Sequence, residues 1–297
     1  MSDYTGAEAA LPSARQGTNS QLLLSGLLAD YLFEATEGLS SASIVNLLGE
    51  FGISPAGART ALSRVARRGL LVPRRAAGGL RYVISDSARD IHHERLGRVV
   101  RFGAAAPPWD GTWCVVAFSV EERLRTLRTR LRSSLEKLGF APMTDAIWVS
   151  PHDRSADVAA AAAELGVNVA IFRATEVLPD RTGMSPVDAF DLDRLRALYT
   201  GYLARFDPIA EREAAGDVSP SEALQFRSAA LREWREISLE DPDLPAEILP
   251  TDWPQRRAHD LFLRLWRGLG PLALLRVRTL MTDRDADTAA SLAVVDL

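Results

Sequence analysis

The chain has 297 residues, a formal net charge of −4, and 47% hydrophobic and 25% charged residues. Its length exceeds the usual size of one domain, so we expect two or three compact units with real hydrophobic cores. No apolar run approaches the roughly 20 residues that a membrane-spanning helix needs, and the polar start lacks the apolar centre of a signal peptide. These features predict a cytoplasmic protein without a membrane partner.

Residues that commonly carry catalysis or bind metals form no recognisable pattern. The single cysteine, Cys114, lies inside the apolar run WCVVAF and is expected to be a buried strand residue. The four histidines have neither zinc-ligand spacing nor a partnering cysteine pair. Phosphate-binding glycine loops and nucleophile motifs are also missing from the sequence. We therefore expect no catalytic residue, no metal site and no cofactor.

Positive charge is concentrated near the N-terminus. From Ser20 to Arg101 eleven arginines stand against seven acids, whereas residues 102–297 hold 23 basic and 30 acidic side chains. The stretch from Ser54 to Arg81 carries seven of these arginines and no acid. The position of arginine is more informative than its abundance, because the chain has only one lysine. Such a segment favours a surface that binds nucleic acid.

Residues 19–101 have the element order of a winged helix-turn-helix. A loose tail at 1–18 precedes two apolar patterns at helical spacing, which predict two short helices. Ser54 and Pro55 are placed to start a third helix, and Gly69 is placed to end it. Two apolar runs around a Gly-Gly turn then predict a β-hairpin, and a connecting helix follows.

The third helix is predicted to have one apolar face and one DNA-facing face. Small residues at its start would let it approach base edges, while arginines near its end would reach guanine or phosphate. We expect Arg64 and Arg67 to face the major groove and Arg75 or Arg81 to contact phosphate. The alternative is a solvated arginine-rich helix beside a plain hairpin. The side chains predicted to contact double-stranded operator DNA are Ala56, Arg59, Thr60, Ser63, Arg64, Arg67, Arg74, Arg75 and Arg81.

Residues 102–180 are predicted to form a second domain. Pro107 begins a break in the chain, and the apolar patterns beyond it follow the order β-α-β-β-α-β, which is that of a ferredoxin-like fold. The expected class of the whole protein is therefore α+β, with a winged helix-turn-helix followed by a ferredoxin-like domain and a helical C-terminal domain.

Residues 181–297 are predicted to form a helical C-terminal domain. The sequence SPSE, Ser219 to Glu222, has the form of a capping box. Farther along, the segment DPDLPAEILPTDWP together with nearby arginines is a candidate site for a flat anionic ligand, although a connector stiffened by its four prolines is the alternative. The candidate effector-binding residues are Arg232, Trp234, Arg235 and Trp253.

From about Gln21 to Met281 the chain resembles the phenylacetate-degradation repressor family, known as PaaX-like regulators. Three blocks in the right order carry the resemblance: ARTALSRVARRGLL, LRSSLEKLGFAPMTDAIWVSP and LREWREISLEDPDLPAEILPTDWP. The resemblance implies a homodimeric repressor that binds an operator near aromatic-catabolism genes. It also implies release by a small aromatic acid or an aryl-coenzyme A thioester, with effector binding and dimerisation assigned to the helical domain at 181–297. The ferredoxin-like sheet is the other candidate for the dimer surface.

The same resemblance implies that the central domain is similar to the ferredoxin-like nuclease of CRISPR spacer acquisition. Such a nuclease holds a divalent metal with an Asp at the end of its first strand, where this chain has Ser119. We therefore expect no enzyme, and a metal-dependent nuclease is the alternative function. A third possibility is a scaffold that uses its helices for protein contacts, against which the acid-free arginine segment argues.

Overall fold

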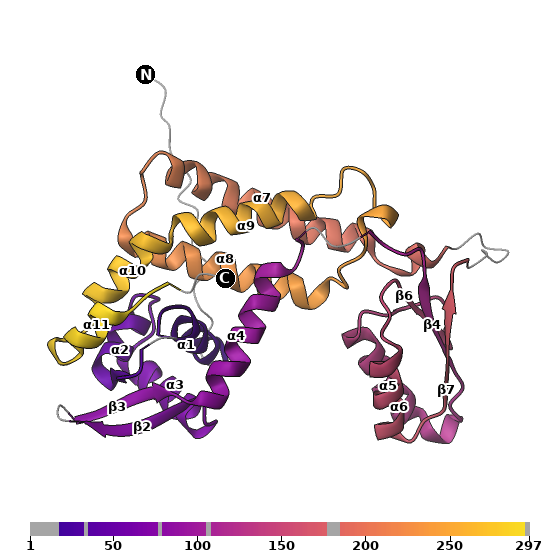
Figure 1. Ribbon diagram of the computed structural model, residues 1–297, viewed down its shortest axis with the longest axis horizontal. Coiled ribbons are helices and arrows are strands. Elements are labelled where there is room, and N and C mark those ends of the chain that lie inside the picture. Colours follow the sequence, from indigo (N-terminus) through magenta and orange to yellow (C-terminus); the bar gives the residue numbers. More distant parts are fainter. Residues whose placement is uncertain (1–17, 33–34, 77–78, 105–107, 177–184, 295–297) are drawn as a thin grey trace. The chain divides into compact units, whose positions relative to one another are not determined.

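A computed structural model describes residues 18–32, 35–76, 79–104, 108–176 and 185–294 (Figure 1). The predicted α+β class is confirmed, with two small antiparallel sheets and a helical C-terminal part. The chain divides into two compact units. The first unit comprises Met1–Val100, Ile209–Arg232 and Leu263–Leu297, and the second comprises Arg101–Pro208 and Glu233–Phe262. The region assigned from the sequence to one C-terminal domain is thus shared between both units.

Three helices at the start of the first unit form where the sequence signals predict them. They are α1 (Thr18–Tyr31), α2 (Ser41–Gly49) and α3 (Pro55–Arg67). Ser40 caps α2, and the Ser54 side chain accepts the Gly57 N–H at 3.2 Å to cap α3. The apolar faces of the helices pack together, and each contributes residues that are less than 5% exposed, such as Leu24, Ile44 and Leu62. Helical periodicity therefore identified this core.

A three-stranded sheet follows the helices. Strand β3 (Gly79–Ile84) lies between β1 (Leu39–Ser40) and β2 (Leu71–Ala76), and both pairings are antiparallel. The hairpin was predicted, but its turn at residues 77–78 lies outside the described residues. Strand β1 was not predicted, because two residues are too short for a period of two to show. Helix α4 (Asp86–Arg101) is the predicted connecting helix.

The C-terminal part of the first unit adds helices to this body. Helix α10 (Gly270–Thr279) is followed by a 3-10 turn (Asp283–Asp285) and a short helix α11 (Ala286–Ser291) that the sequence did not signal. A buried guanidinium ties this part to α1: Arg227, 0% exposed, pairs with Asp30 and donates to the Trp266 carbonyl at 2.8 Å. Its carbon lies 3.6 Å from the centre of the Trp266 ring.

The second unit contains a four-stranded antiparallel sheet with the order β5-β6-β4-β7. The sequence of elements is the predicted one. They are β4 (Trp113–Phe118), α5 (Arg125–Lys137), β5 (Ala141–Pro142), β6 (Ile147–Ser150), α6 (Ser155–Leu165) and β7 (Val169–Ala174). Alternate residues of β4, including Val116 and Phe118, pack with Leu131, Leu135 and Val158 of the two helices. Cys114 is in the same core and is 2% exposed, as predicted.

Three long helices contribute to both units, and they are α7 (Leu192–Ala214), α8 (Pro220–Glu240) and α9 (Gln255–Gly268). In the second unit their core is aromatic. The Trp234 ring is 0% exposed and lies 5.4 Å from Phe262, 5.5 Å from Tyr202 and 5.5 Å from Phe102, between ring centroids. Among the described residues, none of the helices combines the length and apolarity that crossing a bilayer requires.

The capping box predicted at the start of α8 is present in full. Ser219 Oγ accepts the Glu222 N–H at 3.3 Å, and the Glu222 carboxylate accepts the Ser219 N–H at 3.0 Å and its Oγ–H at 2.7 Å. These bonds, together with Arg212, lower the pKa of Glu222 from 4.5 to about 2. The charged carboxylate therefore holds the first turn of α8.

Replacing Ser219 by Ala should lower the free energy of unfolding by about 1 kcal/mol, because two partners of the first turn are lost. A carboxyl whose pKa falls on folding contributes stability above its unfolded pKa, and this contribution is lost as the pH drops through the folded value. Urea unfolding should therefore show a larger Ser219→Ala effect at neutral pH than near pH 2. Ser219→Thr, which keeps the hydroxyl, is the control. An equal effect at both pH values would contradict the role of the carboxylate.

Candidate nucleic-acid interface

Helix α3 presents two chemically different faces, and the structure places them as the sequence predicts. Ala58, Ala61, Leu62 and Val65 are buried against the other helices. The opposite side carries small and hydroxyl side chains toward the start of the helix and guanidinium groups toward its end. Its exposed residues are Ala56, Arg59, Thr60, Ser63, Arg64, Arg67 and Arg68.

The local sequence explains why this helix begins and ends where it does. Ser54 supplies the N-cap, and Pro55 at the first position has no N–H that would need a partner. The two basic residues of the last turn, Arg64 and Arg67, lie where the helix dipole favours positive charge. Gly69 follows with a φ of 75°, a conformation that side chains rarely adopt. Both ends of α3 therefore have local stabilising features.

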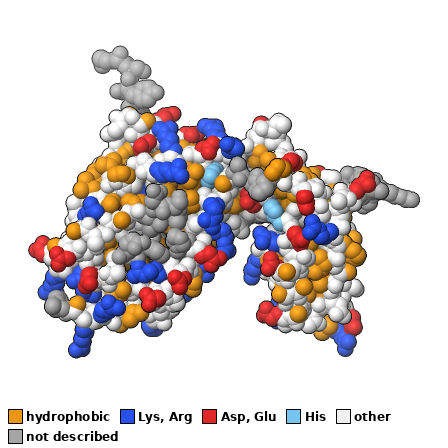
Figure 2. Space-filling view, viewed as in Figure 1, with side chains coloured by type: hydrophobic (Ala, Val, Ile, Leu, Met, Phe, Trp, Pro, Cys, Tyr) orange, Lys and Arg blue, Asp and Glu red, His pale blue; other side chains and the backbone are white. Residues whose placement is uncertain are grey.

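The hairpin adds two more exposed arginines, Arg74 and Arg75 of strand β2. Figure 2 shows blue side chains standing out along the edge formed by this hairpin. In the part of the chain that the structure describes, Arg59, Arg64 and Arg67 of α3, like these two, form no ion pair with an acid. These five guanidinium groups thus present their charge to solvent. A protein surface of this kind can bind a polyanion such as DNA.

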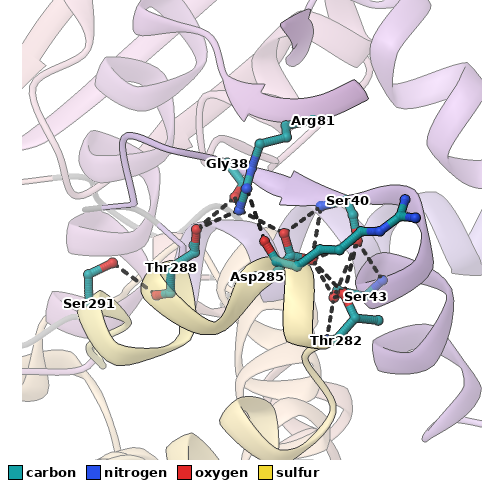
Figure 3. A network of polar contacts seen from close by, with 9 residues as sticks. Gly38, Ser40, Ser43, Arg81, Thr282, Asp285, Thr288 and Ser291 are labelled. Carbon is teal, nitrogen blue, oxygen red and sulfur yellow. Dashed lines mark hydrogen bonds and ion pairs between the residues drawn. The ribbon is translucent and has the colours of Figure 1, made fainter. Parts of the chain in front are cut away.

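Arg81 differs from the other predicted contacts. Its side chain is 15% exposed, and its guanidinium lies 2.7 Å from the carboxylate of Asp285 (Figure 3). It also donates to the Gly38 carbonyl at 3.3 Å and to Thr288 Oγ1 at 2.9 Å. The structure therefore gives Arg81 internal partners, in place of the phosphate contact assigned from the sequence. No sequence signal links Arg81 to Asp285, because they are 204 residues apart.

The candidate effector-binding residues do not form one exposed site. Trp234 is fully buried in the aromatic core, so its ring cannot line a ligand surface in this arrangement. Arg232 is half-buried and Arg235 is exposed, both on α8. Trp253 is half-buried, with the Arg196 guanidinium 5.1 Å from its ring centre. The structure connects the two tryptophans only through packing, since each lies about 6 Å from the ring of Tyr199.

The proline-rich segment beside these residues is tightly bound to the rest of the second unit. Asp241 is buried, accepts a hydrogen bond from the Tyr199 hydroxyl, and accepts the Asp243 N–H at 2.6 Å. Burial raises the pKa of Asp241, although these hydrogen bonds lower it in part. The His152 ring lies 2.8 Å from the Asp243 carbonyl. Asp243 itself has a φ of 59°. These contacts support the connector interpretation of the segment.

The structure also shows where the residues considered for nuclease chemistry lie. Ser119 is exposed directly after β4, at the position where the resemblance expects a metal-binding Asp. Among the described residues no group of three or more His, Cys, Asp or Glu side chains is arranged to hold a metal ion. Burial raises the pKa of the Cys114 thiol, which disfavours its nucleophilic form.

Comparisons with known proteins agree with these observations. Three family models match in order: "PaaX-like protein" over residues 19–88, "PaaX protein central Cas2-like domain" over 106–184 and "PaaX-like protein C-terminal domain" over 190–275. The chain is 27% identical over 260 residues to the transcriptional repressor PaaX of Escherichia coli (strain K12), and the match covers 85% of this chain and 81% of that protein.

Among solved structures, the uncharacterized protein Rv0674 from Mycobacterium tuberculosis has a similar fold. The TM-score is 0.55 at 24% identity, and the match covers 84% of this chain and 95% of that one. The family models together cover most of the chain, from residue 19 in α1 to residue 275 in α10. The chain therefore belongs to the PaaX-like family.

Proposed function

We propose that this protein is a transcriptional repressor that binds operator DNA through the first unit. The observation that carries the proposal is the set of exposed arginines on α3 and β2, without an acid partner among the described residues. The order of three helices and a hairpin, with β1 added to the edge of β3, supports a winged helix-turn-helix. The Escherichia coli relative is a transcriptional repressor, which supports the same role here.

In this proposal α3 lies in the major groove. The exposed Ala56, Thr60 and Ser63 let the backbone approach base edges, and Arg64 and Arg67 reach guanine or phosphate. The β2–β3 hairpin acts as the wing, whose Arg74 and Arg75 neutralise backbone phosphates. Base-reading contacts would carry sequence specificity, and phosphate contacts would carry much of the salt-dependent affinity.

For the second unit we propose a ferredoxin-like domain with a regulatory role rather than an enzymatic one. The sheet order β5-β6-β4-β7 places the first and third strands of this domain in the centre, and α5 and α6 share one core with it. Both features support that fold. Ser119 in place of a metal-binding carboxylate weighs against the alternative function, a metal-dependent nuclease.

We further propose that a small aromatic acid or an aryl-coenzyme A thioester releases the protein from DNA near aromatic-catabolism genes. The resemblance to PaaX-like regulators supports this effector class. An inducer must bind a DNA-incompetent state more tightly than the competent one, and its effect cannot exceed that difference in affinity. Arg235 is exposed near this region, whereas the Arg196 guanidinium beside Trp253 is already paired with the Asp252 carboxylate at 3.0 Å.

The double variant Arg64→Ala, Arg67→Ala should bind operator more weakly, by roughly 1–3 kcal/mol for each base-reading arginine removed, with relaxed specificity. Arg75→Ala should weaken binding to all sequences and reduce the slope of log K against log salt by about one. Fluorescence anisotropy with a duplex from upstream of its own gene, at several salt concentrations, measures both.

The matched control for these variants is Arg130→Ala, an exposed arginine on α5 to which this proposal gives no role. All of these side chains are exposed, so stability should change by less than about 0.5 kcal/mol. If the double variant bound the duplex as tightly as the parent, α3 would not be the reading helix.

A homodimer should bind an imperfect inverted repeat, because one winged helix covers too few base pairs for selection among genomic competitors. Light scattering with and without the operator duplex checks this. We expect the mass of the complex to exceed that of the duplex by twice the mass of one chain. Monomers under both conditions would rule out this arrangement.

Phenylacetyl-coenzyme A, or a close aryl thioester, should bind the full chain in calorimetry and lower its operator affinity. The full chain is needed because residues 209–232 and 263–294 belong to one unit with the N-terminal residues, and deletion of 1–101 would expose the core of that unit. Free coenzyme A is the control. If neither the thioesters nor their free acids bind or shift operator affinity, the effector class is wrong, while repression itself can stand.

A further inference from the structure

The last described segment of the chain inserts a buried carboxylate into the N-terminal body. Asp285 is 0% exposed and accepts hydrogen bonds from the Ser40 N–H at 3.1 Å, from Ser40 Oγ at 2.6 Å and from Ser43 Oγ at 2.5 Å. The Arg81 guanidinium lies 2.7 Å from its other oxygen (Figure 3). Asp285 therefore joins the start of α2 to strand β3.

Neighbouring contacts hold the same segment in place. The Thr282 N–H donates to Ser43 Oγ at 2.9 Å, and Thr288 Oγ1 donates to the Gly38 carbonyl at 3.2 Å. Burial raises the pKa of Asp285, but the bonds from Ser40 and Ser43 and the Arg81 charge more than offset this, so the pKa lies below its usual value. The carboxylate is consequently charged at neutral pH.

The strand register shows what this charge does for the hairpin. Ser40 of β1 and Arg74 of β2 both lie directly opposite Arg81 of β3. Directly opposite residues share one face of a sheet, and like charges there destabilise the pairing. Asp285 neutralises Arg81, so that Arg74 keeps its exposed charge beside it without a repelling neighbour. Arg74 is one of the hairpin groups that the proposed function directs at phosphate.

We propose that Asp285 is a positioning residue for DNA binding, which fixes β3 against the start of α2 and thereby sets the hairpin arginines relative to α3. The inference rests on the proposed function and extends it to residues 276–297, which no matched family model covers. Ser40 also caps α2, the helix that packs on α3. Asp285 thus contacts α2, which packs on α3, and β3, which pairs with the strand β2 that follows α3.

The test compares Asp285→Asn with Asp287→Asn in the full chain. Asp287 lies in α11, directly after the N-cap residue Asp285, and is exposed, so its replacement makes the same charge change without touching the network. We expect Asp285→Asn to weaken binding to the upstream duplex by about 5- to 150-fold, the usual range of coupling between sites. Asp287→Asn should bind like the parent. Circular dichroism and urea unfolding verify that the fold is retained.

A double-mutant cycle with Arg74→Ala separates positioning from general stability. Arg74→Ala should cost less affinity in the Asp285→Asn background than in the parent, because a misplaced hairpin no longer delivers that arginine to phosphate. If Asp285→Asn does not fold, Thr288→Val, which removes a hydroxyl from the network and keeps the carboxylate, takes its place in the same cycle.

Several outcomes would overturn the inference. They are an unchanged affinity in Asp285→Asn, an Arg74→Ala cost that is equal in both backgrounds, and a failure of both network variants to fold. Tighter binding with a salt slope steeper by about one would mean that Asp285 withholds Arg81 from DNA, which also contradicts positioning. Loss of binding in the Arg64, Arg67 double variant but not in Asp285→Asn would reject this inference and leave the proposed function intact.

Discussion

The first unit depends on the burial of one guanidinium group. Arg227 of α8 is fully buried, where an unpaired charge would cost several kcal/mol. It meets Asp30 of α1, the Tyr31 hydroxyl at 3.0 Å, and both the carbonyl and the ring of Trp266 on α9. Removing either member of the ion pair would leave the other buried without its partner. Helices α1, α8 and α9 therefore have to stay together for this unit to fold.

Two further acids repeat this arrangement at the two ends of α2. Glu50, just after the helix, accepts two bonds from the Arg276 guanidinium at 2.9 and 2.7 Å and one from the Ser221 hydroxyl. Asp285 binds the start of the helix, and the Asn46 amide donates to the Leu280 carbonyl at 3.1 Å. Side chains and backbone of the C-terminal segment thus hold α2 at both of its ends and along its length. The compact unit is discontinuous for this reason.

The parts of the fold that the sequence predicts are those with local causes. Ser54, Pro55 and Gly69 act within a few residues of themselves, and the Ser219–Glu222 box spans one turn, so a pattern of residues is enough to locate these helices. The exposed face of α3 follows from the same periodicity.

Pairings between segments far apart in the sequence could not be predicted in this way. Asp285 gives no local signal of its partners, and the short β1 and α11 leave no period to detect. Trp234 was grouped with nearby arginines as a ligand-lining residue, yet it is the centre of an aromatic core. Composition around a residue indicates what could bind there, whereas only its packing determines whether its surface is free.

The burial of Cys114 has a practical consequence for measuring local opening of the second unit. It is the only thiol of the chain, lies on the central strand β4, and is 2% exposed. An alkylating reagent can reach it only when the sheet and its helices separate, so the rate of modification follows the population of that opened state. The wild-type chain thus contains an intrinsic reporter of local opening in this core. A cysteine added at any exposed position would react far faster and could be labelled selectively.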